Sequence, residues 1–255
     1  MDAPWVDTHG HLFLVDDDAA AVLDRAEVAG VAWVMCPGVD VSSSEASRAL
    51  AQRFPTSVKW SCGLHPHDAA SWPDVAERIA ELAAEADAVG ECGLDWYRNL
   101  APRDAQITAF TEQVTLAKDL DKPVIIHCRD AFANVYEILA DAGLGERAVL
   151  HCWTGGTKWT KRFAEIGVTF SYAGPLTYLA DETLRLGARF APPQRTMVET
   201  DSPYLTPEPL RGASNEPANV VHTGAVLADV WGVDVAEAAR LTTATAVRLF
   251  GDPRG

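Results

Sequence analysis

The chain has 255 residues, of which 48% are hydrophobic and 22% are charged, so it can bury a sizeable core and lacks the polar composition of a disordered protein. It carries 21 lysines and arginines against 36 aspartates and glutamates, a formal net charge of -15. This charge disfavours a broad basic surface that would hold duplex nucleic acid or an anionic membrane, because both kinds of binding depend on neutralising negative charge.

The sequence also bears on location. Its first residues have no basic segment typical of a secretion signal, and no segment reaches the roughly 18 to 20 consecutive apolar residues of a membrane span. The five cysteines are odd in number and form no Cys-x-x-Cys pair. We therefore expect a cytoplasmic protein, with no membrane association and no obligate protein partner.

Short apolar runs rich in β-branched residues alternate with helical patterns along the chain. Eight such runs lie at residues 4–8, 31–36, 58–63, 87–92, 123–128, 148–152, 167–171 and 196–200. Their starts are about 20 to 35 residues apart, the length of one strand-helix unit. The spacing predicts an α/β fold, a single (β/α)8 TIM barrel over residues 1–255. A doubly wound open sheet is the alternative, but no Gly-x-Gly-x-x-Gly follows the first run.

Helix signals separate these runs. Ser42 and Glu45 have the spacing of a capping box, and Pro102 is placed to open a helix that continues to about Leu120. A proline-rich loop over residues 203–217 follows the last run, where it would cross the top of a barrel.

Candidate metal ligands occur where the predicted strands end, which is where barrel enzymes place their chemistry. These residues are His9, His11, Glu91, His127, His151 and Asp201. Imidazole nitrogens and carboxylate oxygens bind ions such as Zn²⁺ and Mn²⁺, and a carboxylate can bridge two ions. Six of the seven histidines fall at predicted strand ends, a clustering that random placement does not explain.

Strand alternation refines this prediction. His9 and His11 are two residues apart, so in an extended segment they face the same side and can reach one ion. Cys92, Cys128 and Cys152 each follow a proposed ligand directly. We expect their side chains to point away from the barrel axis as small core residues, rather than to serve as metal thiolates.

Seven short motifs extend the pattern. They are Asp7-Thr-His-Gly-His-Leu, Gly63-Leu-His-Pro-His, Gly90-Glu-Cys-Gly-Leu-Asp95, Pro123-Val-Ile-Ile-His-Cys-Arg-Asp130, His151-Cys-Trp-Thr-Gly155, Glu199-Thr-Asp-Ser-Pro-Tyr204 and Asn215-Glu-Pro217. With these seven motifs in this order, the sequence resembles the TatD family of metal-dependent hydrolases, within the amidohydrolase superfamily.

The resemblance implies an enzyme that hydrolyses phosphodiester bonds, a deoxyribonuclease of the 3'-5' exonuclease type, with two divalent metal ions (Zn²⁺, Mn²⁺, Mg²⁺ or similar). Carried over by motif, His9, His11 and Asp201 would hold one ion, and His127 and His151 the other. Glu91 would bridge both. We expect Asp201 also to accept the proton of the attacking water.

Substrate contacts are expected from four further residues: His65, Arg129, Trp153 and Asn215. His65 ends the third strand and belongs to neither metal, so phosphate binding is its expected role, with His67 second. Arg129 is on the same side of its strand as His127, where it could reach an anion or pin Asp130. Trp153 could stack on a base.

One departure leaves the substrate open. Family members commonly carry arginine immediately before the Asn-Glu-Pro motif, whereas this chain has Ser214, and Arg211 is three residues too early to be equated with it. The change removes a bidentate phosphate donor. A single-stranded DNA end and a small phosphoester or amide therefore both remain candidate substrates, beside a non-catalytic binding protein, which the complete ligand set argues against.

Overall fold

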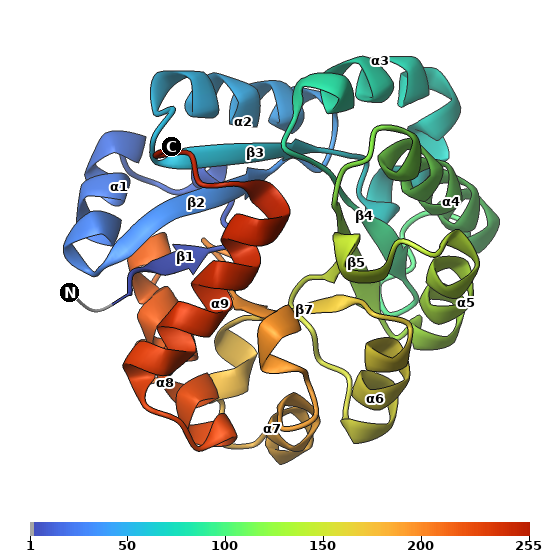
Figure 1. The fold of residues 1–255 in the computed structure, drawn as a ribbon. Helices are drawn as coiled ribbons and strands as arrows, with labels where there is room; N and C mark the ends of the chain where they lie inside the picture. Colours follow the sequence, from blue (N-terminus) through green and yellow to red (C-terminus); the bar gives the residue numbers. More distant parts are fainter. Residues whose placement is uncertain (1–2) are drawn as a thin grey trace.

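The computed structural model describes residues 3–255 and has eight parallel strands in one sheet, ordered β1 to β8 (Figure 1). The strands are β1 Trp5–Asp7, β2 Val31–Pro37, β3 Val58–Cys62, β4 Ala88–Asp95, β5 Val124–Arg129, β6 Ala148–Leu150, β7 Thr169–Tyr172 and β8 Thr196–Val198. Each lies within or close to a run predicted from the sequence. The predicted (β/α)8 barrel is confirmed.

The helices form an outer ring around the sheet. Their bounds are α1 Ala19–Val28, α2 Val41–Arg53, α3 Trp72–Glu85, α4 Arg103–Asp119, α5 Phe132–Ala142, α6 Thr157–Glu165, α7 Glu182–Ala188, α8 Val220–Trp231 and α9 Val235–Phe250. In the described chain, no helix is both long enough and apolar enough to cross a membrane.

Helix α2 begins differently from the prediction. Its N-cap is Asp40, whose side chain accepts the Ser43 amide, while the Ser43 hydroxyl accepts the Asp40 amide. The predicted capping box at Ser42 and Glu45 is therefore wrong, because the preceding aspartate takes the cap position and Ser42 falls inside the helix.

Backbone hydrogen bonds between the segments that follow β1 and β8 close the barrel. The amide of Thr8 donates to Val198, and the amide of Asp201 donates to the carbonyl of His9 at 2.8 Å. The buried Asp7 carboxylate accepts the amide and the hydroxyl of Thr200 at 2.8 and 2.6 Å. These contacts hold His9 and Asp201 side by side although they are 192 positions apart in the sequence.

The barrel interior is filled with apolar side chains that meet helix α9 at one end. Val6, Met35 and Met197 belong to this interior cluster, together with Phe250 of α9. Helix α9 crosses in front of the strands in Figure 1. Because α9 packs on this end, the opposite end, where the strands terminate, remains available for a site.

Candidate metal centre

A cavity of about 740 Å³ opens at the carboxyl ends of the strands. Five of the six predicted metal ligands line it: His11, Glu91, His127, His151 and Asp201. The sixth, His9, is fully buried and stacks beneath the cavity on the ring of His151, with ring centroids 4.0 Å apart. The fold thus brings all six predicted ligands together.

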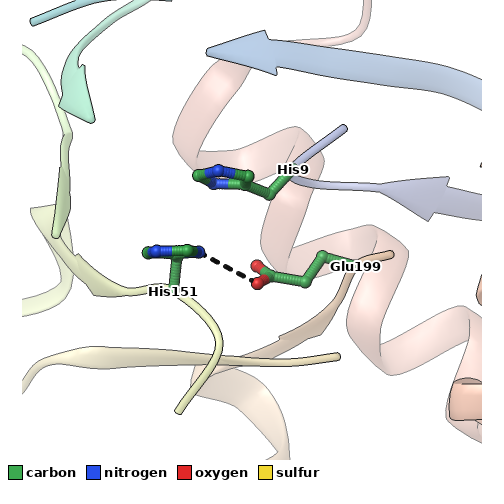
Figure 2. A group of neighbouring side chains, drawn as sticks. All are labelled: His9, His151 and Glu199. Atoms are coloured by element: carbon green, nitrogen blue, oxygen red, sulfur yellow. Dashed lines mark hydrogen bonds and ion pairs between the residues drawn. The ribbon is translucent and has the colours of Figure 1, made fainter. Parts of the chain in front are cut away.

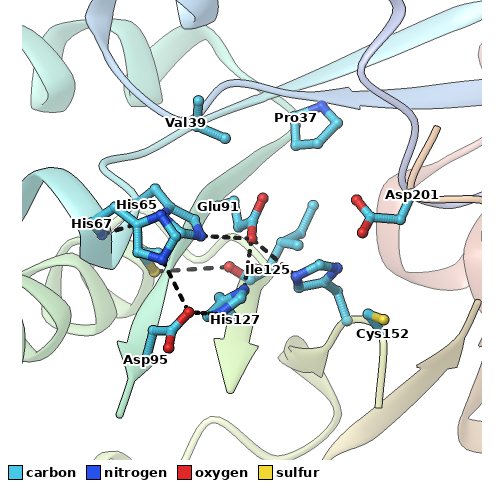
Figure 3. Close-up of polar contacts among 12 residues, drawn as sticks. Pro37, Val39, His65, His67, Glu91, Asp95, Ile125, His127, Cys152 and Asp201 are labelled. Carbon is cyan, nitrogen blue, oxygen red and sulfur yellow. Dashed lines mark hydrogen bonds and ion pairs between the residues drawn. The ribbon is translucent and has the colours of Figure 1, made fainter. Parts of the chain in front are cut away.

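Glu91 lies at the centre of this cluster, and its two oxygens face different histidines. Figure 3 shows the carboxylate beside His65 and His127. Oε2 lies 3.2 Å from His9 Nε2 and 3.9 Å from His11 Nε2. Oε1 lies 3.0 Å from His151 Nε2 and 3.2 Å from His127 Nδ1. The carboxylate therefore stands between two groups of imidazoles and contacts each group with a separate oxygen.

Asp201 completes the first group. Its Oδ1 is 3.4 Å from His11 Nε2 and 3.8 Å from His9 Nε2. The donor atoms of these three residues lie close enough together to hold one metal ion. Two further sets of donor atoms lie equally close together: one belongs to His65, Glu91 and His127, the other to His9, His151 and Glu199.

Both central carboxylates are ionised. Burial alone would raise the pKa of Glu91, but the neighbouring His151 and His127 outweigh burial and hold the pKa well below its usual value. The pKa of Asp201 is lowered despite burial because His11 donates to it and His9 is near. Two buried negative charges facing imidazoles make a site that attracts cations.

Residues behind the histidines fix their rings. His151 donates from Nδ1 to Glu199 Oε1 at 3.2 Å (Figure 2). Its other ring nitrogen, Nε2, faces Glu91. His11 donates from Nδ1 to the carbonyl of Pro37 at 3.3 Å. Metal-ligating histidines usually make such a contact through the second ring nitrogen, because it sets the tautomer and the orientation of the ring.

His9 gives the most direct indication that the cluster binds a cation. Both of its ring nitrogens are buried without a hydrogen-bond partner, and although Nε2 approaches Glu91 it does not have the geometry of a hydrogen bond. An unpaired buried imidazole is costly unless something binds it. The donor set of imidazole nitrogens and carboxylate oxygens fits a divalent ion.

His65 also lies in the cavity, as predicted, but its protonation distinguishes it from the other histidines. Its Nδ1 accepts the amide of His67 at 3.2 Å, so the neutral ring carries its hydrogen on Nε2, 3.4 Å from Glu91 Oε1. Burial lowers the pKa of His65 to about 3, so the ring is neutral at physiological pH. Its Nε2 can therefore donate a hydrogen bond into the cavity.

Two predicted substrate contacts are wrong. Trp153 has 1% of its surface exposed, packs against Phe163 and donates from Nε1 to Thr160, so no base can reach its ring. Asn215 is fully buried, and its amide group donates to the carbonyls of Thr200 and Tyr204. Both side chains hold the structure around the cavity. Arg129, in contrast, lines the cavity.

Sequence reasoning gave no role to two carboxylates that orient the ligands. Glu199 holds His151, and Asp95 accepts from Nε2 of both His127 and His67 at 3.1 and 3.0 Å. Strand alternation offered the signal, since Asp95 is four residues beyond Glu91 and Glu199 is two residues before Asp201, which predicts the same side in each case.

The expectation for the cysteines holds for Cys92, which is fully buried, but not for Cys152. Cys152 lies on the cavity wall because β6 ends at Leu150 and the chain has already turned, with a φ of 42° at Cys152. Strand alternation therefore no longer applies. Cys128 also borders the cavity, although only 9% of it is exposed.

The barrel and the histidine-carboxylate cluster at its open end define a metal-dependent hydrolase. The family model described as "TatD related DNase" matches residues 6–251. The chain therefore belongs to the TatD family.

Individual relatives agree with this assignment. The chain is 34% identical over 247 residues to the 3'-5' ssDNA/RNA exonuclease TatD of Pectobacterium parmentieri, covering 92% of this chain and 94% of the relative. It is 32% identical to the uncharacterized metal-dependent hydrolase YabD of Bacillus subtilis, covering 96% and 98%. Among solved structures, the TatD homologue YJJV from Escherichia coli K12 superimposes with a TM-score of 0.91 at 28% identity, covering 98% and 99%.

Proposed function

We propose that this protein is a divalent-metal-dependent exonuclease that removes nucleotides from the 3' end of single-stranded DNA. The observation that carries the proposal is Glu91, whose two oxygens face two separate groups of imidazoles. This arrangement supports two ions sharing one carboxylate. The names of the TatD relatives support phosphodiester bonds in single-stranded nucleic acid as the substrate.

Each ligand has a place in this scheme. His9, His11 and Asp201 would hold one ion, His127 and His151 the other, and Glu91 both. When bound, the ions would lower the pKa of a water molecule and neutralise charge on the phosphoryl oxygens. Asp201 is ionised and its side chain is 16% exposed at the cavity, so it can accept the proton of that water.

His65 would bind the scissile phosphate. Its neutral ring keeps a hydrogen on Nε2, and this nitrogen faces the cavity beside Glu91. Asp95 would hold His67 and His127 in position around it. A cytoplasmic location belongs to the same proposal, because the five free thiols fit a reducing compartment.

A second candidate is the hydrolysis of a small phosphoester. Ser214 is exposed and stands where the family commonly has arginine, and Arg211 lies over the ring of Tyr178 at 4.0 Å instead of lining the cavity. The net charge of -15 also disfavours a long polynucleotide tract on the surface.

One assay separates the two candidates. The metal-loaded protein is incubated with 5'-labelled single-stranded DNA and, in parallel, with a panel of nucleotides and sugar phosphates. We expect the labelled strand to shorten stepwise and the panel to react more slowly. The Asp201→Asn variant, purified identically, controls for contaminating nucleases. Activity on the panel alone would exclude the exonuclease function.

A further inference from the structure

The rim of the cavity carries two arginines that the chain leaves unpaired. Arg98 and Arg129 follow β4 and end β5, are exposed, and line the cavity. Within residues 3–255, neither guanidinium forms an ion pair or a hydrogen bond. Arg129 lies over the ring of Tyr97 at 3.9 Å, which directs its long side chain. Unpaired positive charge at this place is notable in a protein with a net charge of -15.

The opposite side of the rim is apolar and aromatic. Leu14 follows β1, and Tyr204 and Leu205 follow β8; all three line the cavity. Leu14 is 43% exposed and Tyr204 is 56% exposed, although both are large apolar side chains. Because the strands succeed one another around the barrel from β1 to β8, the pair β8 and β1 lies across from β4 and β5 (Figure 1). The rim therefore has two arginines on one side, Arg98 and Arg129, beside the exposed Asp68 and Leu100, and exposed apolar side chains on the facing side. We call Arg98 and Arg129 the cationic wall, and Leu14, Tyr204 and Leu205 the apolar wall.

We propose that these two walls orient a single strand: the terminal base packs against Tyr204 and Leu14, and Arg98 and Arg129 bind the phosphates that precede the scissile one. This proposal rests on the exonuclease function proposed above. Guanidinium groups bind phosphates strongly, and bases stack on aromatic rings whatever their sequence. The terminal nucleotide contributes a base but no phosphate beyond the scissile one, so only the remaining strand can use the cationic wall.

The size of the cavity agrees with a site that holds the terminal nucleotide while the remaining strand lies on the cationic wall. At about 740 Å³ it falls in the range of pockets that enclose a compact ligand, so it suits the terminal nucleotide while the rest of the strand leaves over the rim. The two arginines also supply phosphate-binding groups that Ser214 does not. The strand would therefore cross the β4 and β5 side of the rim.

The cationic wall is tested with Arg98→Gln, Arg129→Gln and the double variant. Each is assayed on single-stranded DNA and on bis(4-nitrophenyl) phosphate, which has one phosphate. We expect kcat/KM for DNA, divided by kcat/KM for bis(4-nitrophenyl) phosphate, to fall about tenfold for each arginine replaced. The fall should come mainly from a higher KM for DNA. The slope of log(kcat/KM) for DNA against log salt should become shallower by about 0.7 for each arginine.

Arg103→Gln is the matched control. Arg103 is also exposed and lies over an aromatic ring, Trp96, at 4.7 Å, but it does not line the cavity. The control should keep the wild-type ratio and salt slope. The proposed role of the cationic wall would be overturned if Arg103→Gln lowered the kcat/KM ratio as much as the rim variants do. It would also be overturned if the double variant kept the wild-type ratio and salt slope.

The apolar wall is tested with Tyr204→Ala and a strand whose last nucleotide lacks its base. We expect the wild type to cleave the complete strand about tenfold more efficiently than the baseless one, and the variant to lose this preference. Equal preference in both proteins would overturn the proposed role of Tyr204. If the wild type degrades no oligonucleotide, the exonuclease function itself fails, which distinguishes that failure from unchanged ratios in an active nuclease.

Discussion

Glu199 accepts a hydrogen bond from His151 Nδ1 at 3.2 Å and from the amide of Cys152 at 2.7 Å, and so fixes the imidazole whose other nitrogen faces Glu91. A buried carboxylate in this position sets the tautomer of the ring and strengthens it as a ligand. Glu199 is thus a positioning residue, which acts on the centre through His151.

The Glu199→Gln variant should therefore bind its divalent ion about 10- to 100-fold more weakly. The weaker metal affinity would be measured by titrating activity with the ion and by calorimetry with the same ion. Excess ion should restore most of the turnover. Glu237→Gln, which alters an exposed carboxylate on α9, serves as the control. If excess metal did not rescue activity, Glu199 would have a role other than positioning His151.

Asp201 is expected to matter for turnover itself. Replacement by asparagine keeps the shape of the side chain but removes the charge beside His9 and His11 and the proposed proton acceptor. We expect kcat to fall by about 10²- to 10⁴-fold or more, with little change in thermal stability. Asp229→Asn, at an exposed site on α8, is the control. Near-normal turnover would refute the role of Asp201 as the base.

The barrel and the six ligands could be predicted because both follow from periodic patterns. A strand-helix unit repeats along the sequence, and polar side chains cluster where the strands end. The fold then brings His9 and Asp201 together through backbone hydrogen bonds where the chain leaves β1 and β8, which no local pattern shows.

The predicted substrate contacts of Trp153 and Asn215 are wrong because no periodic pattern determines where these two side chains point. Both follow a strand of the barrel, but position after a strand does not determine whether a side chain faces the cavity or the surrounding helices. Trp153 is directed into a layer of aromatic rings with Phe132 and Phe163, and Asn215 satisfies backbone carbonyls of its own loop. Such three-dimensional contacts of irregular segments cannot be derived from strand alternation.

Metal binding should release protons. Burial alone would lower the pKa of His151, but Glu91 and Glu199 raise it well above its usual value, so the metal-free ring is protonated at neutral pH. A metal ion must displace that proton, and apparent affinity should therefore rise with pH. Calorimetry at pH 7 in two buffers of different ionisation enthalpy measures the release. An observed heat of binding that is the same in both buffers would mean that no proton is released and would contradict this prediction.

Trp153 should contribute to stability rather than to substrate binding. Removing its buried ring in Trp153→Ala leaves a cavity among Phe132, Phe163 and Phe170, with an expected cost of about 3 to 5 kcal/mol in the free energy of unfolding. Trp153→Phe preserves most of the packing and should keep KM for DNA. Urea denaturation and kinetics on the same samples separate the two roles. A raised KM for Trp153→Phe at unchanged stability would restore the stacking role.

Two buried thiols should make the free energy of unfolding fall in alkaline solution. Burial raises the pKa of Cys36 and Cys62 from 9.0 to about 11. Below pH 9 both thiols stay protonated whether the chain is folded or unfolded. Above pH 9 the unfolded thiols ionise first, so each should lower the free energy of unfolding by about 1.4 kcal/mol per pH unit until the folded thiol also ionises near pH 11.

The Cys62→Ala variant isolates one of these thiols. The substitution leaves a small cavity, so the variant should be less stable than the wild type at pH 8. Between pH 9 and 11 the wild type loses the contribution of the thiol and the variant has none to lose, so the stability difference should shrink. Urea denaturation of both proteins across this range measures it. A difference that stays constant with pH would mean that the Cys62 thiol ionises equally readily in the folded and unfolded chain.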